Sequence, residues 1–385
     1  MDNLILNKKI AIVGGGPGGL TLARLLQLQG ADVKLYERDA SRESRVQGAI
    51  VDLHFESGLK VIEQADLMDT FKANYLVGAD RYRVFDKNGT MRLDEHHKAA
   101  SGTFGDPHFR PEIDRGALRN ILLDALHPDT VVWDRQFVSM SHHADGWLLH
   151  FKNGTTATAD IVIGADGARS KIRPYVTDIT SIYSGVTIIQ GEIDNPAVDC
   201  PGMFELMANG NLIILGEGKG ITAQPRGDGG MTFYASAKYP ENWGSDFSSK
   251  EEIYNFLLAF YEGWNEQFFA LFKASDKLII RPLNYFPLDQ EWEAHENITI
   301  IGDAAHLMPP SGEGVNTAML DALDLSEHLT SGKYKDIRSA IAAFEKHMRA
   351  RGTVLALEAL EGNEIMYGAH ALENLLHLLS GERAK

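Results

Sequence analysis

The chain has 385 residues, of which 44% are hydrophobic and 23% are charged, so it is long enough for two globular cores. Its net charge of −16 argues against a nucleic-acid or anionic-membrane partner and favours a small ligand. One cysteine, Cys200, precludes an internal disulfide, and neither a secretory signal nor a membrane-spanning apolar run is recognisable, so a cytoplasmic protein is expected.

The first expected element is a strand, turn, helix and strand that close in about thirty residues. An apolar strand at 9–13 runs into a glycine turn, a helix that ends at Gly30, a strand at 33–36 and then Glu37. Gly14 permits the tight turn, Gly16 lets a pyrophosphate approach the backbone, and Gly19 lets the helix and strand pack closely. Glu37 is suited to accept hydrogen bonds from an unphosphorylated ribose, which indicates FAD or NAD.

The segment after Glu37 begins with a polar connection and continues into an expected helix and an alternating stretch. Arg42, Arg45 and Asp52 lie on a connection before an expected helix near 57–71. These charges are typical of a solvated loop, and their spacing alone does not distinguish that from a binding role. The alternating segment 82–93 contains Asn88-Gly89, which predicts a β-hairpin.

A capped helix is predicted after Asp114, and two arginines fall in its first turns. Asp114 is a preferred N-cap residue, and the helix that follows carries Arg115 and Arg119. A cation at this end opposes the helix dipole unless an anion or a partner compensates it. This mismatch makes Arg115 a better functional candidate than the charges that precede it.

The centre of the chain predicts two kinds of sheet. Short strands are expected at 131–133, 138–141, 147–151, 156–158 and 161–163, and the last leads into Asp166-Gly167 with Arg173 nearby. The residues alone allow either a functional junction or an ordinary capped helix start there. From 186 to 236 the strand-like pieces predict an antiparallel sheet in a second domain, followed by helices at 253–260 and 268–272 and a strand at 278–285.

The C-terminal third begins with a strand at 298–301 and a loop from Gly302 to Asn316. A loop of this composition before a helix presents backbone N–H groups to an anionic or electron-rich ligand. Helices are expected from Ala318 to Leu329, from Ile337 to Arg349, and through a tail that reaches Leu375. The tail is most simply a packing helix across both domains. The pairs His96-His97 and His142-His143 lack zinc spacing, so no metal is expected.

Taken together, three of these motifs resemble the signatures of class A flavoprotein monooxygenases of the aromatic-hydroxylase type. They are the Gly14-x-Gly16-x-x-Gly19 turn with Glu37, the Asp166-Gly167 segment ending in Arg173, and Gly302-Asp303. Several phrases are similar to those of the tetracycline-inactivating monooxygenases, among them Val51-Asp52-Leu53-His54, Trp133-Asp134-Arg135 and Cys200-Pro201-Gly202.

The resemblance implies an α/β fold with a Rossmann-like FAD domain of the aromatic-hydroxylase type, an antiparallel-sheet substrate domain and a long C-terminal helix. The FAD domain would be discontinuous (1–72, 105–178 and 277–325). The substrate domain would comprise 73–104 and 179–276, and residues 326–385 would form a helical segment that bridges the two.

The resemblance also implies a set of site residues. Asp303 would hold the ribityl chain of FAD, Asp52 and Arg115 would also contact FAD, Arg45 would meet the nicotinamide cofactor, and Asp166 would bridge the dinucleotide and hydride-donor regions. The expected cofactor residues are Gly14, Gly16, Pro17, Gly19, Glu37, Arg38, Arg45, Asp52, Arg115, Asp166, Asp303, Pro310, Gly312, Gly314, Val315 and Asn316, and the expected substrate residues are Gln190, Asn211, Thr232, Pro309 and Met366.

The implied activity is carried by the flavin, so no side chain is expected to be catalytic. NADPH or NADH would bind transiently and reduce FAD, dioxygen would add at C(4a), and the hydroperoxide would hydroxylate a polycyclic or aromatic molecule, possible examples being tetracyclines. The protein is expected to be a monomer. Alternatives are a hydroxylase of an unrelated aromatic metabolite, a flavin-dependent halogenase, for which no Trp-x-Trp-x-Ile motif is present, and a non-catalytic protein that sequesters FAD or a ligand.

This chain departs from the tetracycline-inactivating enzymes at three places. It has Asn211 and Thr232 where they carry arginine and histidine, and its loop 310–314 is one residue shorter. Glu313 replaces a glutamine that is common in that loop, and it is expected to turn to solvent or to be hydrogen-bonded. The loss of an arginine at 211 predicts weaker binding of acidic polycyclic substrates, by about 1–3 kcal/mol if the contact is buried.

Overall fold

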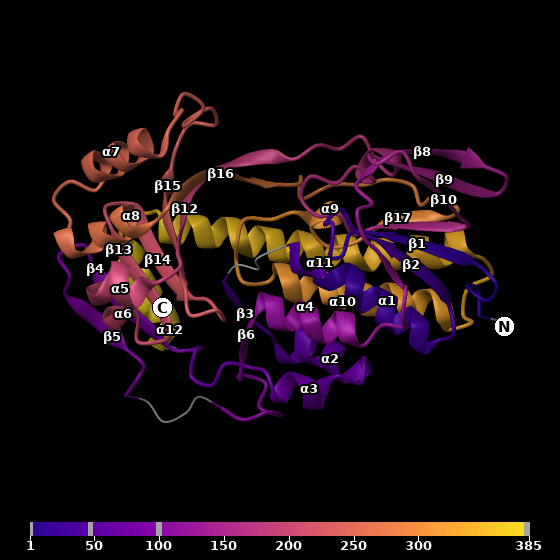
Figure 1. Ribbon diagram of the computed structural model, residues 1–385, viewed down its shortest axis with the longest axis horizontal. Helices are drawn as coiled ribbons and strands as arrows, with labels where there is room; N and C mark the ends of the chain where they lie inside the picture. The colour runs from indigo at the N-terminus through magenta and orange to yellow at the C-terminus, as the bar shows by residue number, and fades with distance from the viewer. Residues whose placement is uncertain (1–2, 45–48, 98–101, 381–385) are drawn as a thin grey trace.

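The computed structural model describes residues 3–44, 49–97 and 102–380. Figure 1 shows two sheet-containing halves, with the long helix α11 (Ile337–Met366) running lengthwise from one to the other. Within the described residues, no helix is long and apolar enough to cross a membrane.

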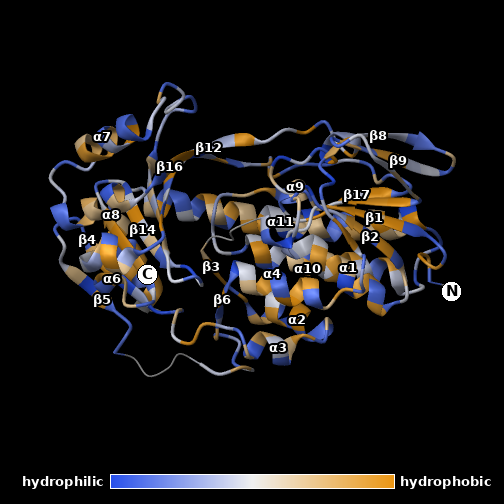
Figure 2. Cartoon of the chain, in the orientation of Figure 1, coloured by the Kyte–Doolittle hydropathy of each residue, from blue (hydrophilic) through white to orange (hydrophobic). Residues whose placement is uncertain are grey.

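The half that contains the N-terminus is built on a five-stranded parallel sheet in the order β17-β11-β1-β2-β7. Its central strands are mostly apolar and buried, and Figure 2 shows the hydrophobic colour of β1 and β17. The strands are β1 (Lys9–Val13), β2 (Asp32–Tyr36), β7 (Val131–Val132), β11 (Ile161–Gly164) and β17 (Ile298–Ile300).

Helices and a small antiparallel sheet cover this parallel sheet. Helix α1 (Pro17–Leu28) packs against α10 (Gly314–Thr330) and α4 (Arg115–Asp124), and α4 is capped by Asp114 as predicted. The antiparallel sheet consists of β8 (Phe137–His143), β9 (Gly146–Phe151) and β10 (Thr156–Ala159), and it contacts β1 and β11. Short 3-10 turns lie at Arg42–Ser44 (η1), Arg173–Tyr175 (η3) and Glu266–Phe268 (η4).

The prediction of a single helix near 57–71 is wrong, because this segment forms three short helical elements. It forms a π-helical turn η2 (Phe55–Leu59), α2 (Lys60–Gln64) and α3 (Met68–Lys72), with Asp66 in the left-handed region at φ 60° between the last two. The π turn is held from far along the chain, because the side chain of Asn316 accepts from the backbone N–H of Gly58 at 3.2 Å. A local sequence pattern carries no signal for such a contact.

The other half is a seven-stranded sheet in the order β16-β12-β15-β14-β13-β4-β5. Most neighbours are antiparallel as predicted, but β4 and β13 are parallel. The strands are β4 (Tyr82–Asp86), β5 (Met91–Asp94), β12 (Ile182–Ile193), β13 (Asn211–Gly216), β14 (Lys219–Pro225), β15 (Met231–Lys238) and β16 (Lys277–Tyr285).

One face of this sheet forms a second hydrophobic core with α5 (Pro196–Asp199), α6 (Pro201–Met207), α7 (Lys250–Phe260) and α8 (Phe269–Ala274). Fully buried Phe233 and Phe272 are at its centre, with ring centroids 5.8 Å apart. A two-stranded ribbon of β3 (Ile50–Asp52) and β6 (Glu112–Asp114) lies between this half and the parallel sheet (Figure 1).

The C-terminal helices differ from their predicted bounds. The loop after β17 contains a short helix α9 (Asp303–His306), and α10 begins at Gly314 instead of Ala318. The segments expected as a helix at 337–349 and a separate tail form one 30-residue helix, α11, and a final helix α12 (Ala371–Ser380). Asp336 and Ser339 form a capping box at the start of α11, which accounts for its sharp beginning.

A buried carboxylate joins three of these helices. Asp321 on α10 is fully buried; it accepts from the N–H of Gly302 at 2.8 Å and from Arg351 on α11 at 2.9 Å, and it pairs with His306 on α9 at 2.5 Å. Burial alone would lower the pKa of His306, but Asp321 holds it above its ordinary value. The loop after β17 is therefore fixed by charge as well as by packing.

Replacing Asp321 by asparagine should destabilise the protein by about 3–5 kcal/mol, because it leaves the buried His306 and the half-buried Arg351 without their shared partner. The control is Asp324→Asn, which removes the second carboxylate of Arg351 from a partly exposed position and should cost about 1 kcal/mol or less. Urea unfolding measures both. Equal costs for the two variants would show that the loop is fixed by packing alone.

Candidate functional site

The predicted cofactor motifs meet at one edge of the parallel sheet. Gly14 follows β1, Glu37 follows β2, Asp166 follows β11 and Asp303 follows β17. Because the strands are parallel, these four residues lie beyond the same carboxyl ends, which is where open α/β sheets bind ligands.

The glycine turn has the shape that a dinucleotide requires. Gly14 has φ +111°, and a Cβ there would lie 2.3 Å from the carbonyl oxygen of Ala165. A Cβ on Gly19 would lie 2.1 Å from the carbonyl oxygen of Gly14. By contrast, a Cβ on Gly16 would meet nothing within 4 Å, and this residue caps α1 without a side-chain bond, with Pro17 beginning the helix. The open N-terminus of α1 therefore fits a pyrophosphate.

Glu37 is in place but is engaged by backbone. It is 3% exposed and accepts from the N–H groups of Gly15 at 2.6 Å and Asp39 at 3.0 Å. Its contact with a ribose stays a prediction, as does that of Arg38, which is exposed just after it. Arg45 lies outside the described residues.

The junction after β11 is a capped turn and contains no α-helix. The carboxylate of Asp166 accepts from the hydroxyl of Ser170 at 2.5 Å and from the N–H of Lys171 at 2.6 Å, and burial raises its pKa. Arg173 in η3 donates to the carbonyl oxygens of Ala304 and Ala305, each at 3.0 Å. Its burial lowers its pKa to about 10. The second motif therefore holds the end of α9, the helix that Asp303 begins.

Asp303 is exposed at the start of α9. Desolvation by the surrounding protein nevertheless raises the pKa of its carboxyl, and His306 and Arg115 partly oppose this effect. A Cβ on Gly314 would lie 3.9 Å from Oδ1 of Asp303, so the start of α10 adjoins this carboxylate.

The loop 309–314 also reaches the other predicted carboxylate. A Cβ on Gly312 would lie 3.7 Å from Oδ1 of Asp52. Asn316, fully buried at the start of α10, donates to the carbonyl oxygen of Asp52 at 2.9 Å and accepts from the N–H of His54 at 2.9 Å. The structure therefore brings Asp52, Asp303, Gly312, Gly314 and Asn316 together. Of their neighbours, Pro309 is buried, Pro310 exposed and Val315 intermediate.

Glu313 is paired, as expected from its position. Its carboxylate contacts Nδ1 of His54 at 3.1 Å, and Nε2 of the same ring contacts Asp52 at 2.8 Å. Burial alone would lower the pKa of His54, but the two carboxylates raise it to about 9. His54 lies in one of the segments that carry the family resemblance, Val51-Asp52-Leu53-His54. The sequence gave no signal that it pairs with Glu313, because Glu313 is far away along the chain.

Three of the predicted substrate residues share one face of the seven-stranded sheet. Gln190 pairs with Tyr234, and Glu192 and Gln224 both pair with Thr232. The side chain of Gln224 donates to Asn211 at 3.0 Å and so extends this row to β13. Since side chains alternate along a strand, Gln190, Thr232 and Asn211 lie on the polar face, opposite the core beneath α6 to α8.

Each of these three residues already has a defined environment. Gln190 accepts from Arg281 at 2.6 Å, and Asn211 is 3% exposed and donates to Glu112 at 3.4 Å. Thr232 is fully buried, and within the described part of the chain its hydroxyl has no hydrogen-bond partner. Met366 packs in a small apolar cluster with Val84, Leu215 and α12.

Glu112 and Arg115 connect this polar face to the cofactor edge. Burial raises the pKa of Glu112 to about 8, with Asp52, its partner across the β3–β6 ribbon, contributing in the same direction. The positive charge of Arg115 acts on the pKa of Asp303, of Glu112 and of Tyr234 on β15, in each case against the effect of burial. The sequence pattern indicated Arg115 as a candidate. It gave no signal for Glu112, which is a single acidic residue in a short strand.

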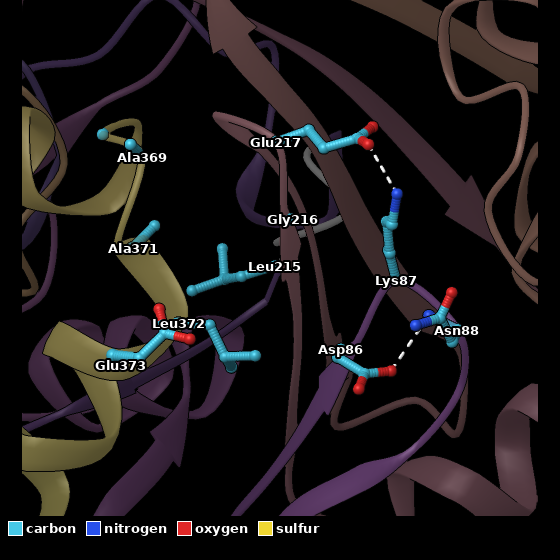
Figure 3. Close-up of a pocket in the computed structure, with 11 residues that line it drawn as sticks. Asp86, Lys87, Asn88, Leu215, Gly216, Glu217, Ala369, Ala371, Leu372 and Glu373 are labelled. Carbon is cyan, nitrogen blue, oxygen red and sulfur yellow. Dashed lines mark hydrogen bonds and ion pairs between the residues drawn. The ribbon is translucent and has the colours of Figure 1, made fainter.

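A separate cavity of about 240 Å³ lies between the turns β4–β5 and β13–β14 and the start of α12 (Figure 3). None of the predicted site residues lines it. Its one lysine, Lys87, is neutralised by Glu217 at 2.5 Å. The cavity therefore has no charge arrangement that identifies a ligand.

Comparisons with known proteins agree with this geometry. The family model described as an FAD binding domain matches residues 7–253 and 289–336. Monooxygenase asqM of Emericella nidulans is 30% identical over 379 residues, which cover 83% of this chain and 83% of that protein.

Two solved structures share the fold at low sequence identity. Klebsiella pneumoniae HpxO complexed with FAD and uric acid superposes with a TM-score of 0.74 at 21% identity, covering 99% of this chain and 95% of that one. The tetracycline destructase Tet(55) gives a TM-score of 0.77 at 21% identity, covering 97% and 95%.

Two glycine substitutions should separate folding from FAD binding. Gly16→Ala should change the stability of the apoprotein by about 1 kcal/mol or less, since its Cβ meets open space, but it should weaken FAD binding about tenfold or more by filling the place of the pyrophosphate. Gly14→Ala should destabilise the apoprotein itself. Urea unfolding and FAD fluorescence quenching measure the two effects. Undiminished FAD affinity in Gly16→Ala would contradict the proposed pyrophosphate position.

Proposed function

Since the chain belongs to the FAD-binding domain family and is an FAD-dependent monooxygenase, we propose that it uses NADPH or NADH and dioxygen to hydroxylate a polycyclic or aromatic small molecule. The observation that carries the proposal is the polar face of the seven-stranded sheet, which adjoins the cofactor edge through Asn211, Glu112 and Arg115.

The composition of that face supports a flat substrate with polar groups. Gln190, Gln224 and Asn211 offer amide donors and acceptors, and Tyr234 lies among them with its pKa raised by burial. Amides and a phenol can bind hydroxyl and carbonyl groups around the edge of a ring system. The uric acid complex of HpxO and the tetracycline destructase structure both support a ring-shaped substrate with polar groups, and they are two different examples of that class.

The residues of this chain would bind and position rather than transfer protons. FAD, when bound, supplies the redox and oxygen-transfer chemistry. The open N-terminus of α1 would hold its pyrophosphate and Asp303 its ribityl chain. The N-terminus of α10, which has no side-chain cap, offers N–H groups to negative charge at the ring system. The sheet face would place the substrate carbon and exclude water.

The direct test is aerobic oxidation of NADPH and of NADH by the FAD-loaded protein, with and without candidate substrates. Hydroxylation predicts substrate-stimulated oxidation and a product one oxygen heavier by mass spectrometry, with the oxygen derived from labelled dioxygen. Tetracycline and uric acid are the first substrates to try. Failure of both nicotinamides to reduce the flavin would refute the proposal. An unchanged mass of a tested compound would exclude that compound as a substrate.

The residue at 211 should set the affinity for acidic polycycles. An arginine there would first meet Glu112, so the informative variant is Asn211→Arg combined with Glu112→Gln, with Glu112→Gln alone as the control. We expect the double variant to bind an anionic tetracycline more tightly than the control by about 1–3 kcal/mol, because a charge-assisted contact is gained. Equilibrium titration measures this difference. Equal affinities would contradict the position assigned to Asn211.

A further inference from the structure

The chain carries an acidic residue where a bound flavin requires positive potential. Glu313 is the N-cap of α10, and its side chain makes no capping bond to the helix. A carboxylate free to approach this end would offset about half an elementary charge of helix dipole. Its position between Asp52 and Asp303, reached through Gly312 and Gly314, makes its charge relevant to the cofactor.

His54 is placed to neutralise that carboxylate. Its ring contacts Asp52 with Nε2 at 2.8 Å and Glu313 with Nδ1 at 3.1 Å. Ionised carboxylates only accept hydrogen bonds, and a neutral imidazole has a single N–H to donate. An imidazolium has an N–H on each ring nitrogen and so can donate toward both carboxylates, which a neutral ring cannot do.

The ring cannot easily turn away from this arrangement. The backbone N–H of His54 donates to the side chain of Asn316 at 2.9 Å, and Asn316 also donates to the carbonyl oxygen of Asp52. The side chain of His54 is only 13% exposed. The same asparagine thus joins the backbone between β3 and η2, which carries His54, to the helix that follows Glu313.

We propose that His54 is a positioning residue of the flavin site, whose imidazolium holds the Glu313 carboxylate away from the N-terminus of α10 and so preserves the positive potential offered to FAD. The inference rests on FAD binding and is independent of the substrate. It explains how a loop with glutamate can serve a site that requires positive charge.

The other charges that face this cluster do not replace His54. Arg110 approaches Asp52 only to 4.0 Å and from an exposed position. The other acids nearby are Asp303, beside Gly314, and Glu112, across the ribbon from Asp52, and burial raises the pKa of both. Within the described residues, removal of His54 would therefore take away the cation that contacts Glu313 and leave Asp52 only the exposed Arg110.

The test is a double-mutant cycle on the midpoint potential of bound FAD with His54→Gln, Glu313→Gln and the combined variant. His54→Gln should lower the preference for reduced over oxidised FAD by about threefold to tenfold, because Glu313 is then an unpaired negative charge. In the Glu313→Gln background, the same substitution should change the preference less than twofold, an order-of-magnitude expectation from the loss of that charge. An equal decrease in both backgrounds, or none in either, would overturn the proposal.

The pH dependence gives a second readout. The pKa of His54 in the folded protein is about 9, so the imidazolium predominates below that pH and is lost as pH rises through 9. The potential of wild type relative to Glu313→Gln, compared at each pH to cancel the flavin's own titration, should fall above pH 9. A difference that is constant with pH would contradict the role of the imidazolium.

A measurement on the apoprotein separates this proposal from the function of the enzyme. Histidine-ring NMR should give a His54 pKa near 9 in wild type and a lower one in Glu313→Gln, whether or not any substrate is turned over. A His54 pKa that Glu313→Gln leaves unchanged would refute the pairing. Unfolding curves recorded for all variants would show whether a change in the midpoint potential of FAD is caused by a loss of folded protein.

Discussion

The carboxylate of Asp321 is the constraint on which the site depends. It is fully buried, and it binds the backbone of Gly302, the ring of His306 and the guanidinium of Arg351. A buried anion is tolerable only when hydrogen-bond donors and cations fill its acceptor sites, so the three segments that carry these groups have little freedom. Arg173 supports the same turn from the other side through the carbonyl oxygens of Ala304 and Ala305. The direction of Asp303 follows from both contacts.

The two sheets carry different parts of the predicted site. The parallel sheet collects the cofactor motifs at its carboxyl edge, because every strand there points the same way. The seven-stranded sheet buries one face against α5 to α8, and its other face carries the row of Gln190, Thr232 and Asn211 beside the small apolar cluster that packs on α12. The β3–β6 ribbon joins them, because Asp52 adjoins Gly312 and its cross-strand partner Glu112 is bonded to Asn211 of the seven-stranded sheet. The predicted cofactor and substrate positions are therefore linked by one short element.

Much of this could be predicted because its signals are local. The turn from Gly14 to Gly19, the Asp114 cap and the Asn88-Gly89 hairpin all depend on residues near each other in sequence. What sequence reasoning missed depends on partners far along the chain. The π turn at Gly58 is held by Asn316, 258 residues away, and Asn211 meets Glu112 across 99 residues. The resemblance to a known family predicted Asn211 as a substrate contact, but only the fold reveals what it already binds.

The strand order has a consequence for how the protein is made. The central strand β1 is flanked by β11, which in turn pairs with β17 near residue 300, so the sheet is assembled from segments that leave the ribosome at very different times. Such non-local pairing folds slowly and exposes strand edges until it is complete. The glycine turn is synthesised well before Asp303 and Asn316, which lie far downstream along the chain. The predicted FAD site is therefore complete only after the segment that carries these two residues has been made.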